Sequence, residues 1–223
     1  MRLSGRDLLG RKVLIIGEVG AGKTRLTASL LEELLRLVGA AEVTVIDMAP
    51  PRFAGAGGRL RDYLSAEGLR YLEPERVVPP RLAGRTAEEV LAHARANYEA
   101  LRPLVLAYLQ RPTRVLVVND LSIYLHAGPL EDVLSCARAA ETFLANSYYG
   151  ESLADDKGSG VSERERRLVE ELARHMDLVL RVPPPPGRPP ALKVPSEGEG
   201  GGLLPNVREA ACEGERWKPL RRP

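Results

Sequence analysis

The chain is poor in cysteine and in long apolar segments. Its 223 residues include only two cysteines, Cys136 and Cys212, which stand far apart. Isolated cysteines exclude a disulfide framework and a cysteine-based metal site, and they are typical of a reducing compartment. No apolar run approaches the length of a membrane span, and the first residues lack a secretory signal. These absences predict a cytoplasmic protein with no membrane partner.

The chain also lacks an excess of charge of one sign. Its 32 lysines and arginines nearly balance its 30 aspartates and glutamates, which leaves a formal net charge of +2. Such a balance produces no strong electrostatic field, so nucleic acid is not indicated as a partner. The three histidines, His93, His126 and His175, do not have the spacing of metal ligands. The length suits one α/β domain.

One glycine-rich segment is the most informative feature that is present. Residues 17–24 read Gly-Glu-Val-Gly-Ala-Gly-Lys-Thr and match G-x-x-x-x-G-K-[ST], the phosphate-binding loop or Walker A motif. The preceding residues, Lys12 to Ile16, form an apolar run typical of a buried strand. The residues after the loop repeat leucines at helical spacing. Strand, loop and helix is the order that this motif requires.

The chemistry of this segment is that of a polyphosphate site. A helix start has unpaired N–H groups and partial positive charge, and glycines let the backbone wrap around phosphate oxygens. Lys23 is expected to reach the β- and γ-phosphates, and the Thr24 hydroxyl to bind Mg²⁺. On these residues the chain resembles the P-loop NTPase superfamily, which implies binding of a nucleoside triphosphate with Mg²⁺. The residues expected to contact the nucleotide are Gly17, Glu18, Val19, Gly20, Ala21, Gly22, Lys23, Thr24 and Arg25.

Further strands and helices are predicted to alternate along the chain. Strands are predicted at 42–47, 114–120, 142–147 and 177–182, although 142–147 could also extend the preceding helix. Helices are predicted from Thr86 to about Gln110, from Pro129 to Glu141 and from Ser162 to about His175. Thr86 with Glu89 and Ser162 with Glu165 have the spacing of capping boxes. Helical connections imply a parallel sheet, so the fold class is α/β: a three-layer sandwich with a mainly parallel sheet of five or six strands.

The composition changes after Val182, where proline and glycine become frequent. Residues 1–182 are therefore predicted to form the nucleotide-binding domain and residues 183–223 a C-terminal extension. An added edge strand near 191–194 is one interpretation of the extension. The last residues resemble a tail that is either partly disordered or docked through Trp217.

Polar residues end three of the predicted strands: Asp47, Asn119-Asp120 and Asn146-Ser147. Ligands bind at the carboxyl ends of the strands in an open parallel sheet, so these residues are expected to converge on the glycine loop. Asp120 follows four apolar residues, as the Walker B acid does. Its carboxylate is predicted to hold Mg²⁺ opposite Thr24, with a cap of the next turn as the alternative.

The residue after Asp120 is Leu121, where many hydrolytic P-loop ATPases have a glutamate that activates water. The hydrolytic base is therefore unassigned. Asp47 is the best substitute, either orienting water or accepting a proton, against a structural role in a turn. Asn146 is predicted to sense the γ-phosphate if 142–147 is a strand. His126 lies soon after Asp120 and either faces the site or has a local structural role.

Two segments contain cations that could form a lid or an arginine finger. One follows Asp47 and the other follows the predicted strand at 142–147. The second set also resembles a solvated helix face. The candidate cations are Arg52, Arg59, Arg61, Lys157, Arg164, Arg166 and Arg167.

Guanine-binding N-K-x-D and the D-x-x-G switch are missing, so ATP is the default nucleotide. The chain is predicted to be a Mg²⁺-dependent ATPase that drives a conformational or assembly change, with a protein partner or a homo-oligomer compatible. The alternatives are a kinase for a small molecule or nucleotide, and a switch protein with negligible turnover. Strand order separates them: the strands of the loop and of Asp120 are neighbours in kinases and GTPases, whereas recombinase-type ATPases place the Asn146 strand between them.

Overall fold

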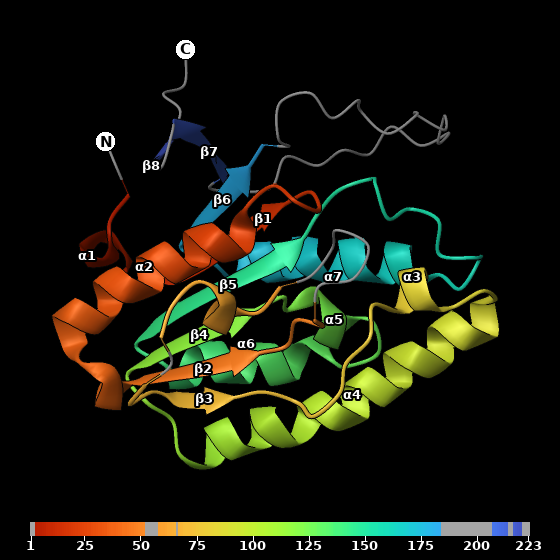
Figure 1. Cartoon of the computed structure of the whole chain (residues 1–223), viewed down its shortest axis with the longest axis horizontal. Helices are drawn as coiled ribbons and strands as arrows, with labels where there is room; N and C mark the ends of the chain where they lie inside the picture. The colour runs from red at the N-terminus through yellow and green to blue at the C-terminus, as the bar shows by residue number, and fades with distance from the viewer. Residues whose placement is uncertain (1–2, 52–57, 66, 184–206, 214–215, 220–223) are drawn as a thin grey trace.

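A computed structural model describes residues 3–51, 58–65, 67–183, 207–213 and 216–219 of the chain (Figure 1). At its centre is one eight-stranded sheet with the order β3-β2-β4-β5-β1-β6-β7-β8. The first seven strands in this order are parallel to one another, and the eighth, β8, pairs with β7 in the antiparallel direction. The α/β class with a mainly parallel sheet is therefore confirmed, and the sheet is larger than the predicted five or six strands.

The five strands predicted from the sequence are all present. They are β1 (Lys12–Gly17), β2 (Val43–Asp47), β4 (Val115–Asn119), β5 (Thr142–Tyr148) and β6 (Leu178–Val182). Three strands were not predicted, namely β3 (Arg70–Leu72), β7 (Val207–Glu213) and β8 (Arg216–Pro219). Part of the predicted tail, including Trp217, thus extends the sheet. The edge strand predicted near 191–194 lies outside the described residues.

Helices cover both faces of the sheet (Figure 1). One face carries α1 (Gly5–Leu8) and α2 (Lys23–Val38), and the other carries α4 (Ala87–Gln110), α5 (Ser122–Leu125), α6 (Leu130–Ala139) and α7 (Val161–Arg174). The short helix α3 (Pro80–Ala83) precedes α4, and single 3₁₀ turns occur at η1 (Ala40–Glu42) and η2 (Leu60–Asp62). None of the helices in the described part of the chain is long and apolar enough to cross a membrane.

Alternate residues of β1 pack into opposite layers. Leu14 and Ile16 join the core beneath α4 to α7, whereas Val13 and Ile15 join the core beneath α2. All four side chains are fully buried. A strand covered on both faces needs a continuous apolar run, which is what residues 13–16 provide. The predicted three-layer sandwich is therefore confirmed.

Thr86 caps α4 as predicted, but the Glu89 carboxylate accepts from Arg85 and not from Thr86, and the start of α7 differs from the prediction. The Glu89 N–H donates to Thr86 Oγ1 at 3.2 Å, and the Glu89 carboxylate accepts the Arg85 N–H at 2.7 Å. Helix α7 begins at Val161, after Gly160 with a φ of 74°. The predicted capping box of Ser162 and Glu165 is therefore wrong, because the helix begins one residue earlier and Glu165 is turned into the interior.

Strand β5 lies between β1 and β4. Residues Lys12 to Gly17 of β1 pair with Phe143 to Tyr148, and Val115 to Val118 of β4 pair with Thr142 to Ala145. The ambiguous segment 142–147 is thus a strand, and it separates the strand of the glycine loop from the strand of Asp120. Of the two orders considered from the sequence, this is the order of recombinase-type ATPases.

Candidate nucleotide-binding site

A cavity of about 310 Å³ lies at the carboxyl ends of the central strands. Its walls come from the glycine loop and the start of α2, from the residues after β4, from the end of β5, and from α3. Most of the residues predicted to bind nucleotide or metal line this one cavity. These are Val19, Gly20, Gly22, Lys23, Thr24, Arg25, Asp120 and Asn146.

The glycine loop, residues 17–24, has a backbone suited to an anion. Gly20 and Gly22 have φ values of 73° and 90°, which lie in the left-handed region that favours glycine. No described residue accepts the N–H groups of Gly20, Gly22, Lys23 and Thr24 in this loop. Unpaired amides that surround a helix start form a binding site for phosphate oxygens.

Gly17 has a different reason to be glycine. A Cβ built on it would lie 2.6 Å from the Val182 carbonyl oxygen at the end of β6. Such an approach is too close for any side chain, so the loop can leave β1 beside β6 only from a glycine.

Lys23 folds back over this loop. Its Nζ donates to the Gly17 carbonyl at 3.0 Å and to the Glu18 carbonyl at 2.8 Å. Burial lowers the pKa of Lys23, and the negative charges of Asp120, Glu18 and Glu165 oppose that shift. A bound polyphosphate would supply the counter-charge that the buried ammonium group needs. The loop and its lysine therefore fit a triphosphate.

Asp120 is held at the cavity by its backbone and by its side chain. It has a φ of 55°, its N–H donates to Asn146 Oδ1 at 3.0 Å, and its Oδ1 accepts the Ser122 hydroxyl at 3.2 Å. Burial raises the pKa of Asp120, with Glu165 adding to the shift and Lys23 and His126 opposing it. A cation beside this carboxylate would stabilise its charged form.

The oxygen donors at the cavity suit Mg²⁺. Thr24 and Asp120 both line the cavity, and each supplies a hard oxygen ligand. Across the ranges that the structure describes, no cluster of three or more His, Cys, Asp or Glu side chains could hold a metal ion by itself. Mg²⁺ commonly binds through few protein ligands together with substrate phosphates and water, so this small donor set fits.

Asn146 lies in the cavity wall, but its amide is already committed. Its Nδ2 donates to Thr27 Oγ1 at 2.9 Å and to Asn119 Oδ1 at 2.7 Å, and its Oδ1 accepts from Asp120. Both N–H groups are therefore used, and contact with a γ-phosphate through Nδ2 would break one of these bonds. This geometry favours a role in positioning Asp120, and the γ-phosphate contact stays a prediction.

Asp47 does not join the other predicted site residues. It is fully buried and does not line the cavity. Its Oδ1 accepts from Asn119 Nδ2 at 2.8 Å and from the Ala49 N–H at 3.2 Å, while its Oδ2 accepts from the Leu60 N–H at 2.7 Å and from the Tyr71 hydroxyl. With four donors around it, the carboxylate has no room for a reacting water. This geometry favours a structural role, and the catalytic role of Asp47 stays a prediction.

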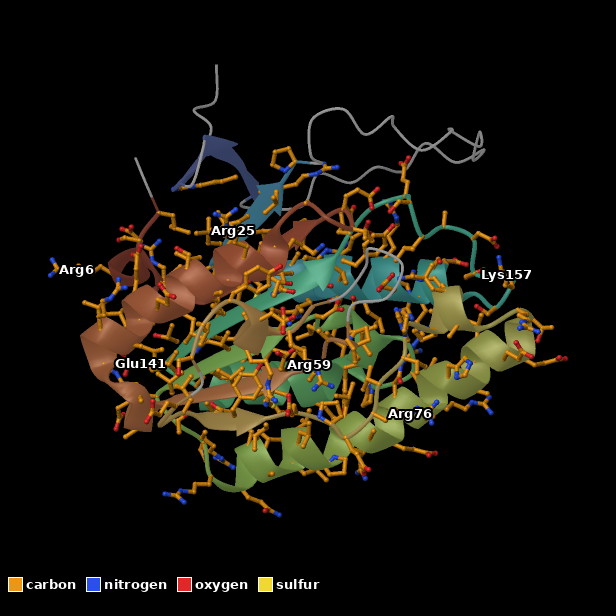
Figure 2. All side chains as sticks on the ribbon, in the orientation of Figure 1. Arg6, Arg25, Arg59, Arg76, Glu141 and Lys157 are labelled. Carbon is orange, nitrogen blue, oxygen red and sulfur yellow. The ribbon has the colours of Figure 1, made fainter. Side chains whose placement is uncertain are left out.

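Five of the seven cations predicted as a lid or finger have other partners. Arg59 and Arg61 both pair with Glu73, at 3.1 Å and 2.5 Å. Arg164 donates to the carbonyls of Leu125 at 3.1 Å and Gly128 at 2.8 Å. Lys157 pairs with Asp155, and Figure 2 shows it at the right-hand edge of the molecule. Arg166 donates to the Tyr149 hydroxyl at 3.4 Å, Arg167 is exposed, and Arg52 lies outside the described residues.

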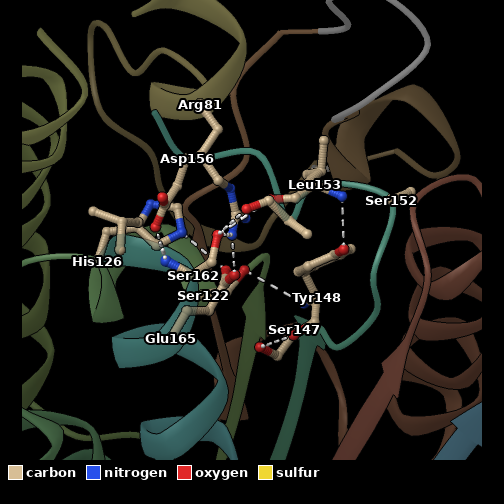
Figure 3. A network of polar contacts seen from close by, with 12 residues as sticks. Arg81, Ser122, His126, Ser147, Tyr148, Ser152, Leu153, Asp156, Ser162 and Glu165 are labelled. Atoms are coloured by element: carbon tan, nitrogen blue, oxygen red, sulfur yellow. Dashed lines mark hydrogen bonds and ion pairs between the residues drawn. The ribbon is translucent and has the colours of Figure 1, made fainter. Parts of the chain in front are cut away.

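A buried ion-pair cluster of Arg81, Glu165 and His126 adjoins the cavity and was not predicted as a unit (Figure 3). Arg81 Nη1 donates to Glu165 Oε2 at 2.5 Å and to Ser162 Oγ at 3.2 Å, and His126 Nε2 lies 2.9 Å from Glu165 Oε1. Arg81 and His126 line the cavity, and Glu165 lies behind them. The burial of Glu165 could have been predicted, because it follows Val161 by four residues and precedes Leu168 by three, on the apolar face of α7. No sequence pattern predicts the position of Arg81.

Glu18 joins the glycine loop to the segment after β5. Its carboxylate accepts the N–H groups of Glu151 at 3.0 Å and Ser152 at 3.1 Å, and the Ser152 hydroxyl at 2.8 Å. A Cβ on Gly150 would lie 2.0 Å from Glu18 Oε1, so the approach requires glycine there. Burial opposes ionisation, but these hydrogen bonds and that from Val19 outweigh it and lower the pKa of Glu18. The Glu18 side chain therefore binds protein, and a contact of its backbone with nucleotide stays a prediction.

No protein-family model matches this chain, and no curated protein does. Similar solved structures include the flagellar accessory protein FlaH from Methanocaldococcus jannaschii, with a TM-score of 0.39 and 14% identity over 78% of this chain and 71% of that one. The Pif1 helicase from Candida albicans has a TM-score of 0.35 and 13% identity over 78% of this chain and 36% of its own. PH0250 from Pyrococcus horikoshii OT3 has a TM-score of 0.39 and 9% identity over 81% and 88%.

Similarity of this degree says nothing of the function of this chain, which has to be argued from its own residues. Those residues place a glycine loop, one lysine, one hydroxyl and one carboxylate around a single cavity at the carboxyl edge of a parallel sheet. The geometry of this site fits a bound polyphosphate.

Proposed function

We propose that the chain is a Mg²⁺-dependent ATPase in which hydrolysis of ATP drives a conformational or assembly change. The observation that carries the proposal is the convergence of Lys23, Thr24 and Asp120 on one cavity, with β5 between the strands of the loop and of Asp120. That strand order is the order of recombinase-type ATPases, and it differs from that of kinases and GTPases. A cytoplasmic protein partner or a second copy of the chain would receive the change.

Each group at the cavity has a part in this reaction. The free N–H groups of the loop and the Lys23 ammonium group would bind the phosphates and the charge that develops on them. Thr24 and Asp120 would hold Mg²⁺, which when bound neutralises phosphate oxygens. Asn146 fixes the backbone of Asp120. Water would form the new bond to the γ-phosphorus as the bond to the leaving diphosphate breaks.

Two alternatives remain open. A kinase is favoured by the size of the cavity, which extends past the loop to an apolar wall that includes Pro80, Leu82 and Ile123, where an acceptor could sit. A switch protein with negligible turnover is favoured by Leu121, which replaces the glutamate of many hydrolytic enzymes, and by the absence of a carboxylate base among the described residues that line the cavity other than Asp120.

The substitution Lys23→Ala tests nucleotide binding. We expect it to weaken ATP binding or turnover by at least about tenfold, because charge-assisted contacts to phosphate are strong. Calorimetric titration with ATP and Mg²⁺ measures the affinity, and Lys157→Ala on the surface is the matched control. Unchanged ATP binding by the Lys23 variant would refute the site. Asp120→Ala should remove the dependence on Mg²⁺ while the protein stays folded.

Product analysis separates the three activities. Steady release of phosphate without an acceptor supports the ATPase. ADP that forms only when a metabolite is added, together with a phosphorylated product, supports the kinase. Tight ATP binding with no ADP after prolonged incubation supports the switch protein and excludes the ATPase.

A further inference from the structure

We propose that Arg81 binds the terminal phosphate of the bound nucleotide together with Lys23, and that Glu165 holds Arg81 in position for this contact. The inference rests on the proposed function, since it presumes a triphosphate on the glycine loop. It assigns a second phosphate-binding cation to the chain itself, at a position where the sequence has no motif.

The first line of support is the position of Arg81. Its residue exposure is only 7%, yet it lines the same cavity as Lys23 and Asp120. It belongs to α3, in which Pro79 is the N-cap and Pro80 the first residue. Proline fixes its own φ and restricts the residue before it, so this approach to the cavity is stiff. A buried arginine on a stiff segment is prepared for one ligand geometry.

The second line of support is the unused hydrogen-bonding capacity of Arg81. A guanidinium group has five N–H donors, and only Nη1 of Arg81 has acceptors, Glu165 and Ser162. No described residue accepts from its Nε or Nη2. Nor are these two atoms sealed in the interior, because the buried unpaired side-chain atoms of the described residues are Arg59 Nε and His126 Nδ1. The free edge of Arg81 is therefore open to a ligand.

The third line of support is the relation between the two cations. Lys23 Nζ lies 6.0 Å from the centre of the Tyr148 ring, and Arg81 Cζ lies 5.1 Å from the same centre. Both cations thus approach one aromatic ring at the end of β5. A terminal phosphate on the loop would lie next to Lys23, and a planar guanidinium group can bind two of its oxygens at once.

Glu165 has the properties of a positioning residue rather than a ligand. It is buried, it does not line the cavity, and each carboxylate oxygen has one partner, Arg81 on Oε2 and His126 on Oε1. Burial opposes its ionisation, but His126 and Arg81 outweigh that cost and lower the pKa of Glu165. An ionised carboxylate only accepts hydrogen bonds, so it turns Nη1 of Arg81 inward and leaves the other edge facing the cavity.

The distinguishing measurement compares ATP with ADP, because only ATP has the phosphate in question. We expect Arg81→Ala to weaken ATP binding in the presence of Mg²⁺ by about tenfold and ADP binding by less than about twofold. Arg81→Lys should give an intermediate loss for ATP, since lysine keeps the charge without the fork. Arg114→Ala is the matched control, because Arg114 pairs with Glu141 on the surface. Calorimetric titration gives both affinities.

The role of Glu165 has its own readout. Glu165→Gln should lower the ratio of ATP to ADP affinity in the same direction as Arg81→Ala, and Glu165→Asp should recover part of it. A purely structural role would change stability without changing that ratio. If the glutamine variant does not fold, because a buried guanidinium group loses its counter-charge, the Arg81→Lys titration alone decides the proposal.

The outcomes separate this inference from the proposed function. Equal ATP-to-ADP ratios in the wild type and in both Arg81 variants, with nucleotide binding lost in Lys23→Ala, would overturn the role of Arg81 and leave the ATPase site intact. An equal loss of ATP and ADP affinity in Arg81→Ala would overturn it too. A wild-type chain that binds neither nucleotide would overturn both.

Discussion

At the scale of single residues, the two acids that end β2 and β4 have opposite surroundings. Asp120 lines the cavity, and its carboxylate accepts one hydrogen bond, from Ser122. Asp47 is fully buried at the end of β2, and its carboxylate accepts four hydrogen bonds. An acid with a free lone pair can bind a ligand, and an acid with every site occupied holds structure. The same residue type at the same edge of the sheet therefore has two environments, one open to the cavity and one closed.

Replacing Asp47 with alanine should destabilise the protein without impairing its chemistry. The substitution leaves the Leu60 N–H and the Tyr71 hydroxyl without this acceptor in the interior, and Asn119 Nδ2 keeps only its bond to the Gly58 carbonyl. We expect the free energy of unfolding to fall by about 3 kcal/mol, as hydrogen bonds to a buried charged group suggest. Urea unfolding measures that loss, and titration should find ATP affinity unchanged. A variant of normal stability with lost turnover would support the catalytic role.

The lowered pKa of Glu18 predicts how stability depends on pH. A carboxyl group with a folded pKa below the unfolded value of about 4.3 stabilises the protein fully above that value. The contribution is lost as the pH falls through the folded pKa. Because Glu18→Gln removes the titrating group, we expect the thermal midpoint of wild type to exceed that of the variant at pH 7 and the difference to shrink below pH 4. A difference that grows on acidification would contradict the assignment.

The site residues that could be predicted are those fixed by local sequence. Lys23 and Thr24 belong to a contiguous motif, and Asp120 ends an apolar run, so their convergence follows from the geometry of parallel strands. Arg81 could not be predicted, since it reaches the cavity through the packing of α3 against α4 and through a partner 84 residues away. The four donors around Asp47 could not be predicted either, because sequence does not reveal which groups surround a strand end.

At the scale of helices and strands, a capping residue predicted the start of a helix correctly only where the backbone before it also leaves the helical conformation. Thr86 caps α4 as predicted, whereas Ser162 lies inside α7. The difference arises because Gly160 ends the preceding loop in a left-handed conformation, which starts the helix before Ser162 is reached. The three-residue strand β3 had no signal, because a strand of that length contains too few residues to show a period.

Thr86→Ala tests the start of α4. The Thr86 side chain accepts the Glu89 N–H at 3.2 Å, and alanine leaves that donor to water. We expect a loss of about 1 kcal/mol in the free energy of unfolding, the usual cost of removing such a cap. Ser29→Ala, at an exposed position inside α2, is the control and should have little effect or stabilise slightly. Equal effects of the two substitutions in denaturant titrations would argue against a capping contribution.

At the scale of the whole molecule, strand order was the part of the fold that the sequence left open. The apolar runs predicted which segments are strands, but each run is buried on both faces and carries no mark of its neighbour. The order emerges only from long-range pairing. Likewise, β7 and β8 join the sheet through β6, although their composition suggested a separate tail.

This order predicts a gradient of backbone protection across the sheet. Strands β1, β4 and β5 have neighbours on both sides and lie beneath helices, whereas β3 and β8 are at the edges. Amide hydrogen exchange followed by mass spectrometry should find the slowest exchange in β1, β4 and β5 and faster exchange in β3 and β8. Exchange in β3 as slow as in β5 would be inconsistent with the edge position of β3.

Four side chains linked by hydrogen bonds fix the register in which the central strands pair. They belong to Thr27, Asn146, Asn119 and Asp47. In the native alignment Asp47 is opposite Asn119, and Val118 is opposite Ala145. A slip of β5 by one residue would bring Ala145 or Ser147 to the place of Asn146 and strand several amide groups in an apolar interior. A sheet interior made only of apolar side chains would leave no polar group unpaired after such a slip. Hydrogen bonds among these four buried side chains thus favour one register of the sheet, and one of the four, Asn146, also lines the ligand cavity.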